Sequence, residues 1–409
     1  MTERLYYHDS FLYDFEGEIR DITETPRPAV TLDRTAFYPT SGGQIHDTGW
    51  ISSGTTKHRV TEVADSEHGR IVHYLEAPAR GLALGSHIRG EIDVVRRRDH
   101  MQQHSGQHVL SAAFVRLFNM PTVSFHMADD YCSIDLETLS LSKEQIESAE
   151  RLANEVILEN RSVDIRFVTR AEAGKVGLRK VPATERDELR LIDISGFDLT
   201  ACGGTHVRQT GQIGCILLRK AEKVRQGYRV EFVAGLRAVA AARRDFTNLT
   251  ETAALFSAHI YEVPQQAAKS LEDIKTLRKQ RAQSLEELAA AQAAALLAET
   301  PEADGRRLVV RTFSDCDINF VKLFAQKLTR LAPNVVALLG TTSPQPALVF
   351  AQSSGGTNDM GARMKETLGK FGGRGGGSKD MAQGGIADSS QVEAVLADAR
   401  ASVGRTSAV

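Results

Sequence analysis

Two pairs of side chains that can bind a metal ion lie far apart in the sequence. The first pair is His104 and His108 in the stretch HSGQH, and the second is Cys202 and His206 in CGGTH. Residues at i and i+4 of a helix share one face, so the first two imidazoles can reach one point. Two glycines keep the second pair out of a regular helix, but a tight loop can still turn both side chains toward a common centre. Three nitrogens and one sulfur suit zinc better than magnesium, calcium or copper(II).

Each pair also has a purely structural explanation. Histidine and cysteine are often buried for packing alone, and metal-ligand spacings arise by chance. Two such pairs in one chain favour a metal site, although the long gap makes the signal weaker than a compact paired CxxC signature. A zinc protease of the HExxH kind is disfavoured, because Ser105 stands where that motif carries its catalytic glutamate.

The first pair is expected on a helix that covers residues 100 to 118. Met101, Ala112 and Val115 lie on the same side as the two histidines, so the imidazoles should occupy a half-buried face. Such a face fits either metal ligands at the floor of a cleft or histidines of the hydrophobic core.

Short alternating runs with turn signals over residues 1 to 95 predict a small β-barrel or sandwich. Within it, residues 35–44, TAFYPTSGGQ, form a loop, because Pro39 and two adjacent glycines break regular structure. Gly42 and Gly43 would let the backbone approach a ligand closely. The loop is therefore either a substrate-side loop or a plain tight turn, and these residues alone favour the turn.

Composition changes after residue 236. Residues 265–298 are rich in Ala, Leu, Glu, Lys and Gln and contain neither Gly nor Pro, which predicts one long helix. Heptad-like apolar pairs, interrupted by two arginines, make this helix a spacer or a short homodimer contact. The final segment alternates strand-like and helical runs, as expected of a small α/β domain.

A second unusual stretch, KFGGRGGGSK, occupies residues 370–379. Backbone N–H groups and Arg374 could close on phosphates there. The stretch lacks the GxxxxGK[ST] order of a nucleotide P-loop, so ATP binding is disfavoured. A flexible linker is the alternative, but the stretch lies between strand-forming and helix-forming segments, which favours a binding loop.

The composition bounds the class of protein. A chain of 409 residues is long enough for two or three domains, and a net charge of -2 argues against wholesale coating of nucleic acid. Four cysteines do not make a disulfide framework, so a reducing, cytoplasmic setting is expected. Acidic residues at the N-terminus replace the apolar core of a signal peptide, and no apolar run reaches membrane-spanning length. A soluble protein without membrane partners is expected.

Taken together, the motifs resemble one known family. The order of FYPTSGGQ, HSGQH, CGGTH followed by GQIG, and GGRGGGSKDMAQGG resembles the editing half of alanyl-tRNA synthetase without its aminoacylation domain. Free-standing proteins of this build form the alanyl-tRNA editing (AlaX) family, and the glycine-rich C-terminal part is similar to the DHHA1 type found in the long members. The resemblance spans nearly the whole chain.

This resemblance implies an α+β multidomain fold. Its parts are a small β-barrel over residues 1–95, an α/β zinc-binding editing domain over 96–235, a helical linker over 236–300 and a DHHA1-like α/β tRNA-binding domain over 301–409. The implied activity is hydrolysis in trans of tRNA(Ala) wrongly charged with serine, and in some members with glycine.

The family's functional positions map onto this chain residue by residue. The implied zinc ligands are His104, His108, Cys202 and His206. The candidate catalytic residues are His104, Gln107 and His108. The candidate substrate-binding residues are Gly42, Gly43, Gln44, Gly203 and Thr205, and the candidate tRNA contacts are Arg363, Lys365, Lys370, Arg374 and Lys379.

Several alternatives stay open at this point. If three side chains bind zinc and one position is free, the metal takes part in the reaction, whereas four ligands make it structural. Gln107 stands where the synthetases commonly have threonine, so the preference for serine or glycine is open. A zinc-stabilised tRNA-binding module without hydrolase activity is the alternative from another class. A small-molecule hydrolase is weaker, because the basic glycine-rich domain would have no task.

Overall fold

The computed structural model describes residues 1–66, 69–179 and 187–403. The chain divides into two units, Met1–Thr252 and Ala253–Val409. The predicted fold class, an α+β multidomain chain that begins with a small β-barrel, is confirmed.

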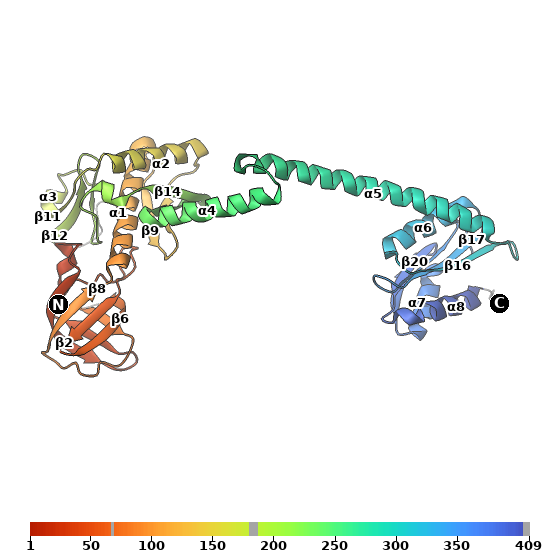
Figure 1. The fold of residues 1–409 in the computed structure, drawn as a ribbon, viewed down its shortest axis with the longest axis horizontal. Helices are drawn as coiled ribbons and strands as arrows, with labels where there is room; N and C mark the ends of the chain where they lie inside the picture. Colours follow the sequence, from red (N-terminus) through yellow and green to blue (C-terminus); the bar gives the residue numbers. More distant parts are fainter. Residues whose placement is uncertain (67–68, 180–186, 404–409) are drawn as a thin grey trace. The chain divides into compact units, whose positions relative to one another are not determined.

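The first unit begins with a closed six-stranded barrel (Figure 1). The strands follow the order β2-β3-β7-β6-β5-β8, and side chains alternate between the apolar interior and the outside, as the period of a strand requires. Their bounds are β2 (Asp14–Thr23), β3 (Ala29–Leu32), β5 (Gly49–Ser53), β6 (Thr56–Asp65), β7 (Ile71–Leu75) and β8 (His87–Ile92). A short segment, β1 (Glu3–Arg4) and η1 (Leu5–Tyr7), precedes the barrel, and β4 (Arg34–Thr35) pairs with β1.

Helix α1 (Val94–Phe118) follows the barrel directly. It begins at Val94 rather than at the predicted residue 100, because the Asp93 carboxylate accepts hydrogen bonds from two amides of the first turn. Every residue from Gln103 to Phe114 is buried, so the predicted half-buried face is wrong. Neighbouring elements cover α1 on all sides over this stretch, and the histidines therefore lie away from bulk water.

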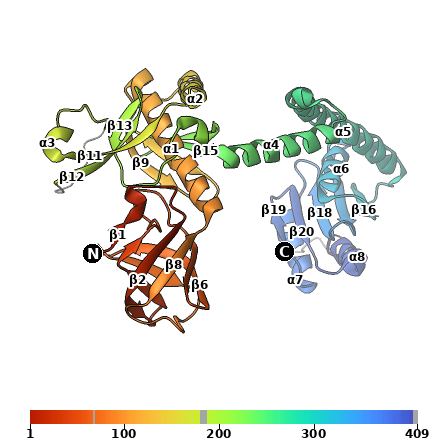
Figure 2. The same cartoon turned by 60° about the vertical axis from the view of Figure 1, so that its left-hand side comes forward.

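Two sheets and a helix enclose α1 in the first unit (Figure 2). One sheet has the order β14-β15-β10-β9 and the other has the order β11-β12-β13. Their apolar faces form one core with α1 and α2. The bounds are β9 (Thr122–Met127), β10 (Cys132–Leu136), α2 (Lys143–Leu158), β11 (Val163–Thr169), α3 (Arg170–Ala173), β12 (Glu188–Ile194), β13 (Asp198–Ala201), η2 (Thr210–Ile213), β14 (Ile216–Val224) and β15 (Gly227–Ala234). Helix α4 (Gly235–Leu255) follows β15.

The second unit contains the long helix that the sequence predicts, α5 (Val263–Glu299), after the short η3 (Ile260–Glu262). It continues into a five-stranded sheet of order β16-β17-β18-β20-β19. The bounds are β16 (Arg307–Phe313), α6 (Ile318–Leu331), β17 (Val335–Thr341), β18 (Ala347–Gln352), α7 (Met360–Lys370), β19 (Arg374–Gly377), β20 (Met381–Gly385), η4 (Ser389–Gln391) and α8 (Val392–Val403). The end of α5 and α6 cover one face of the sheet, and α7 and α8 cover the other. None of the described helices combines the length and the apolarity needed to cross a membrane.

The glycine-rich stretch of the second unit is not the loop that the sequence predicts. Its residues Arg374–Gly377 form the edge strand β19, paired with β20. A Cβ at Gly375 would lie 2.7 Å from the side chain of Leu368 on α7, and one at Gly384 would lie 2.2 Å from it. The glycines therefore let a helix pack directly on the backbone of a strand pair.

A buried ion pair joins α1 to the loop that contains Gly42, Gly43 and Gln44. The Arg97 and Asp47 side chains are both fully buried, with Nη2 and Oδ2 2.5 Å apart. Arg97 also donates from Nη1 to the Ser10 carbonyl oxygen and from Nη2 to the Ala36 carbonyl oxygen. The Asp47 carboxylate accepts a further hydrogen bond from the Tyr38 amide at 2.6 Å. One side chain of α1 thus fixes three segments of the barrel.

We expect Arg97→Met to lower the free energy of unfolding by about 3–5 kcal/mol, because Asp47 would keep a buried charge without its partner. Chemical denaturation measures this. Arg97→Met combined with Asp47→Asn should lose less than the sum of the two single losses. As a control, Arg89→Met removes an exposed pair with Asp14 and should change stability little. Additive losses in the double variant would contradict a coupled pair.

Candidate metal centre

The structure brings the four predicted ligands together. One donor atom from each of His104, His108, Cys202 and His206 lies within 4.8 Å of all the others. The first two come from α1, and the other two come from the loop after β13. Their clustering shows that segments far apart in the sequence converge on one point.

The distances fit a tetrahedral metal. Cys202 Sγ lies 3.4 Å from His104 Nε2 and 3.3 Å from His206 Nε2. A tetrahedron with bonds of about 2.0–2.3 Å separates neighbouring ligand atoms by about 3.3–3.8 Å. The sulfur and the rings of His104 and His206 stand at these separations, and all four donor atoms lie within 4.8 Å of one another, so the group can close on one metal ion.

Gln44 fixes the orientation and the tautomer of His104. The Gln44 Oε1 accepts a hydrogen bond from the Thr205 amide at 3.1 Å, and its Nε2 donates to the Thr205 hydroxyl at 2.9 Å. His104 Nδ1 lies 2.6 Å from the same Oε1 and must therefore be the donor. His104 Nε2 then carries a free lone pair toward Cys202, as a metal ligand requires.

The other two imidazoles also have partners outside the centre. His206 Nδ1 lies 3.2 Å from the Ser105 hydroxyl, which in turn accepts from the Val207 amide. His108 Nδ1 lies 3.5 Å from Asp198 Oδ2, too far for a strong hydrogen bond but close enough for attraction between charges. Outer contacts of this kind hold the rings of metal-binding histidines in place.

The charges around the centre favour a thiolate. Burial by itself raises the pKa of the Cys202 thiol, but the imidazoles of His104, His206 and His108 outweigh it and hold this pKa well below its usual value. Burial also opposes ionisation of Asp198, yet His108 and Arg179 lower the pKa of its carboxyl. The result is a negative sulfur among the imidazoles and a buried, negative carboxylate that contacts His108 and Arg179.

One glycine in each of the two motifs is required by a close contact. A Cβ at Gly43, whose φ is +85°, would lie 2.3 Å from the Phe125 carbonyl oxygen on β9. A Cβ at Gly204 would lie 2.1 Å from the His104 ring, whereas Gly203 faces the Tyr7 hydroxyl and Gly42 has open space. The loop 35–44 is thus a turn that also carries Gln44 to the metal centre.

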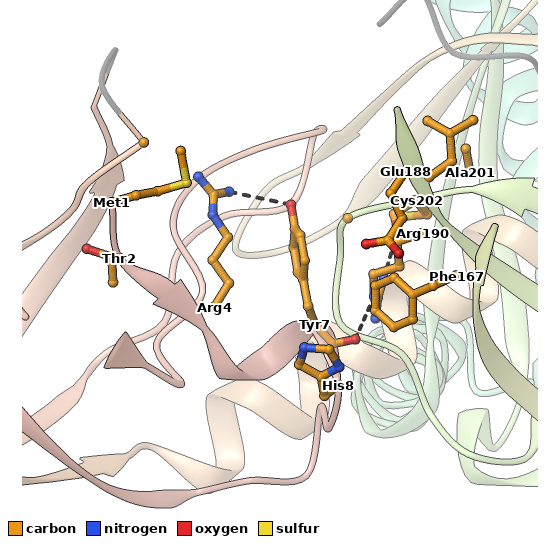
Figure 3. Close-up of a pocket in the computed structure, with 13 residues that line it drawn as sticks. Met1, Thr2, Arg4, Tyr7, His8, Phe167, Glu188, Arg190, Ala201 and Cys202 are labelled. Carbon is orange, nitrogen blue, oxygen red and sulfur yellow. Dashed lines mark hydrogen bonds between the residues drawn. The ribbon is translucent and has the colours of Figure 1, made fainter. Parts of the chain in front are cut away.

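A cavity of about 360 Å³ opens on three of the four candidate ligands from one side. Gln107, Arg179 and Thr200 are among the side chains that line it, together with His104, His108 and Cys202. Gln107 is buried, and its Nε2 donates to the Ser111 hydroxyl at 2.8 Å. A second cavity, of about 760 Å³, reaches Cys202 from the side of the barrel (Figure 3).

The five predicted tRNA contacts all belong to the second unit. Arg363 is bonded to Ser402 and Asn358, and Lys370 forms an ion pair with Asp398 at 2.9 Å. The other three are exposed around α7 and the β19–β20 turn: Lys365, Arg374 and Lys379. These three are the cations most accessible to a phosphate.

Sequence reasoning missed the residues that support the ligands. Arg179 Nε and Asp198 Oδ1 lie 2.6 Å apart in a largely buried ion pair. The Ser105 hydroxyl is within hydrogen-bond distance of His206 Nδ1. The position of Asp198 four residues before Cys202 was the available signal, because a carboxylate close to a ligand often orients one. Arg179 lies in an irregular segment whose place no periodicity predicts.

Comparison with known families identifies three parts of the chain. Residues 3–96 match the class II (A) tRNA synthetases, residues 189–230 match the second additional domain of threonyl and alanyl tRNA synthetases, and residues 306–405 match the DHHA1 domain. These matches cover the barrel, the strands that lead to and follow Cys202, and the sheet of the second unit.

Two kinds of curated relatives are similar to the chain. The alanyl-tRNA editing protein AlaX-L of Pyrococcus horikoshii is 28% identical over 389 residues, which cover 94% of this chain and 95% of that protein. The alanine–tRNA ligases of Methanosarcina mazei and Natronomonas pharaonis are 30% and 32% identical over 97% of this chain. The chain spans only 43% of the length of these two ligases.

We expect Gln44→Ala to weaken metal binding by about 10-fold to 100-fold, because His104 would lose the contact that orients its ring. Competition of the full chain against a chromophoric chelator, with Zn2+ as the probe, measures this affinity. Gln102→Ala is a matched control on α1, since its amide bonds the Gln212 carbonyl instead. An affinity equal to that of the control would show that Gln44 does not support the ligand.

Proposed function

The chain belongs to the long form of the alanyl-tRNA editing (AlaX) family, and from this membership we propose that it removes a wrong amino acid from tRNA(Ala) in trans. The proposed reaction is hydrolysis of the ester in Ser-tRNA(Ala), with Gly-tRNA(Ala) as a second substrate. The observation that carries this proposal is the group of three histidines and one cysteine, of which His104, His108 and Cys202 line a small cavity.

The proposed cofactor is Zn2+. A thiolate and three imidazoles suit zinc better than the oxygen-seeking Mg2+ or Ca2+. When bound, zinc would polarise a substrate or water oxygen if a ligand position is open, and would hold the two chain segments together if all four side chains ligate. The two roles differ in whether turnover survives removal of the metal.

The cavity residues support discrimination by a hydroxyl group. Gln107 uses its Nε2 to bond Ser111, which leaves its Oε1, among the described residues, free to accept a hydrogen bond. The seryl hydroxyl of a mischarged substrate can donate that bond. Alanine cannot, and it would leave a buried acceptor unpaired, which is how a polar site rejects an analogue that lacks a hydroxyl.

The reaction demands little covalent chemistry from the protein. An aminoacyl ester is already activated, so the cavity has to position water and the carbonyl group and stabilise the developing oxyanion. Arg179 lies in the cavity wall, where its charge is partly balanced by Asp198, and we assign it the role of a donor to the developing oxyanion. Gln44, Ser105 and Asp198 act by holding the histidines in position.

The second unit supports a contact with tRNA away from the ester. Lys365, Arg374 and Lys379 present three positive charges to solvent, and such charges bind phosphates without reading sequence. The exposed apolar residues of α5, among them Leu271 and Leu277, support a homodimer contact through that helix. Since charged tRNA and reduced thiols are found in the cytoplasm, we place the protein there.

The decisive test of function is deacylation of Ser-, Gly- and Ala-charged tRNA(Ala) by the full chain. Serine should be released, and alanine should be released more slowly by about 100-fold or more. Gln107→Leu should reduce the preference for serine over alanine while the bound metal stays, with Gln102→Leu as the control. Binding of tRNA without hydrolysis of any ester would favour the alternative of a binding module, and unchanged turnover after metal removal would exclude a reactive metal.

We expect Arg374→Ala to weaken tRNA binding. The slope of log Kd against log salt concentration should fall by about one, as expected for the loss of one phosphate contact. Fluorescence anisotropy of labelled tRNA over a salt series measures both quantities. Arg330→Ala, an exposed arginine on α6 of the same unit, is the matched control. A salt slope that matches the control would show that Arg374 contacts no phosphate.

A further inference from the structure

A third cavity, of about 420 Å³, adjoins the metal centre through Arg179. Arg179 is the one described residue that lines both this cavity and the 360 Å³ cavity. The rest of its wall comes mainly from the second half of α1, the end of β12 and the start of β13. Asp198, whose carboxylate lies beside His108, is part of this wall. A ligand here would therefore be one side chain away from a candidate metal ligand.

Arg116 gives the wall a positive charge that no carboxylate of the described residues balances. Its Nε and Nη2 donate to the Phe197 carbonyl oxygen at 2.9 Å and 2.7 Å, and Nη2 also donates to the Gly196 carbonyl oxygen at 3.0 Å. Its guanidinium carbon lies 4.7 Å from the centroid of the Phe197 ring. These contacts hold the guanidinium in place and leave Nη1 without a partner among the described residues. A fixed cation with a donor to spare is suited to an anion.

Arg179 and Asp193 add a second donor and an acceptor. Arg179 uses Nε and Nη2 to bond the Asp198 carboxylate, at 2.6 Å and 3.1 Å. Asp193 pairs with Arg166 through Oδ2 at 2.8 Å. Neither Arg179 Nη1 nor Asp193 Oδ1 has a described partner, and neither is among the buried atoms that lack one, so both reach solvent. Two guanidinium groups and one available carboxylate oxygen therefore line one cavity.

We propose that this cavity binds a free α-amino acid, with the carboxylate on Arg116 and Arg179 and the ammonium group on Asp193. Hydrogen bonds between charged groups of this kind are the strong ones, and a guanidinium matches the two oxygens of a carboxylate. The inference rests on the proposed function for the identity of the amino acid. Hydrolysis of an aminoacyl ester creates the carboxylate that these arginines would hold, so the ligand is the released serine or glycine.

Other small ligands fit this wall less well. An inorganic anion or a phosphodiester would use the two arginines but would be repelled by Asp193, and an amine without a carboxylate would bind Asp193 but meet the charge of Arg116. A zwitterion satisfies the cations and the carboxylate together.

The shared arginine links this cavity to the proposed reaction. An amino acid held on Arg179 Nη1 would compete with the developing oxyanion for the same guanidinium. The released amino acid would then slow turnover without occupying the ester cavity. Such inhibition lowers kcat and changes KM little, because it acts on a contact made in the transition state.

Titration of the full chain with L-serine in a calorimeter tests the site without requiring turnover. Arg116→Gln and Asp193→Asn should each weaken binding by about 10-fold or more, because each removes a hydrogen bond between charged groups. Arg151→Gln is a control, since this exposed arginine is bonded to the Ser148 hydroxyl. Asp245→Asn is the second control, since it removes a carboxylate that pairs with an arginine elsewhere. Glycerate and ethanolamine, which each lack one of the two charges, should bind more weakly than serine.

Gln107→Leu separates the two cavities, because Gln107 lines the ester cavity and not this one. The binding that depends on Arg116 should be unchanged in Gln107→Leu. Binding lost in Gln107→Leu but kept in Arg116→Gln and Asp193→Asn would place the serine in the ester cavity and overturn the proposal. Equal competition by inorganic phosphate would overturn it as well. Thermal unfolding of each variant shows whether it is folded, and Asp193→Asn decides the matter if Arg116→Gln is not.

Turnover supplies the second readout. Added L-serine should lower kcat in the unmodified chain and have less effect on kcat in Arg116→Gln, whereas inhibition through KM alone in both would contradict the link through Arg179. Deacylation of Ser-tRNA(Ala) by a chain that binds no L-serine outside the ester cavity would overturn the inference and leave the proposed function standing. L-serine binding that depends on Arg116 and Asp193 in a chain without esterase activity would support the site and remove the proposed function instead.

Discussion

The rest of the first unit depends on one buried charge pair, Arg97 with Asp47. Two unsolvated charges are stable only when every donor and acceptor is matched, and here the matching groups come from the Ser10 loop, the strand end at Ala36 and the loop before Asp47. The Ser10 hydroxyl also accepts a hydrogen bond from the His206 amide at 3.1 Å, and the loop before Asp47 places Gln44 against His104. The same loops therefore hold both the barrel and the metal centre in position.

The second constraint concerns the ionisation of Cys202, on which burial and the neighbouring imidazoles have opposite effects. Burial alone would keep the Cys202 thiol neutral, because a low-dielectric site disfavours the thiolate. The three imidazoles reverse this preference, and Asp198, whose carboxyl pKa is lowered by His108 and Arg179, lies beside His108. Within the part that the structure describes, these four residues are the one group of three or more His, Cys, Asp or Glu side chains placed to hold a metal ion.

The sequence predicts the fold class, the long helix over 265–298 and the residues that converge, because these depend on local pattern and on ligand chemistry. It does not predict what depends on contacts across long separations. The burial of every α1 residue from Gln103 to Phe114 follows from packing on two sheets, and the strand at Arg374–Gly377 follows from the approach of α7. The same holds for Gln44, whose partners His104 and Thr205 are 60 and 161 residues away, so no local pattern reveals that it supports a ligand.

These separations also set an order of events during synthesis on the ribosome. The barrel and α1 leave the ribosome before Cys202 and His206. His104 and His108 therefore have no cysteine ligand beside them until the chain has been made through β13. Contacts between such distant segments form slowly because long loops must close first. Metal capture would then come after the docking of the barrel, and a chain that has acquired its metal has already passed through the slowest part of its folding.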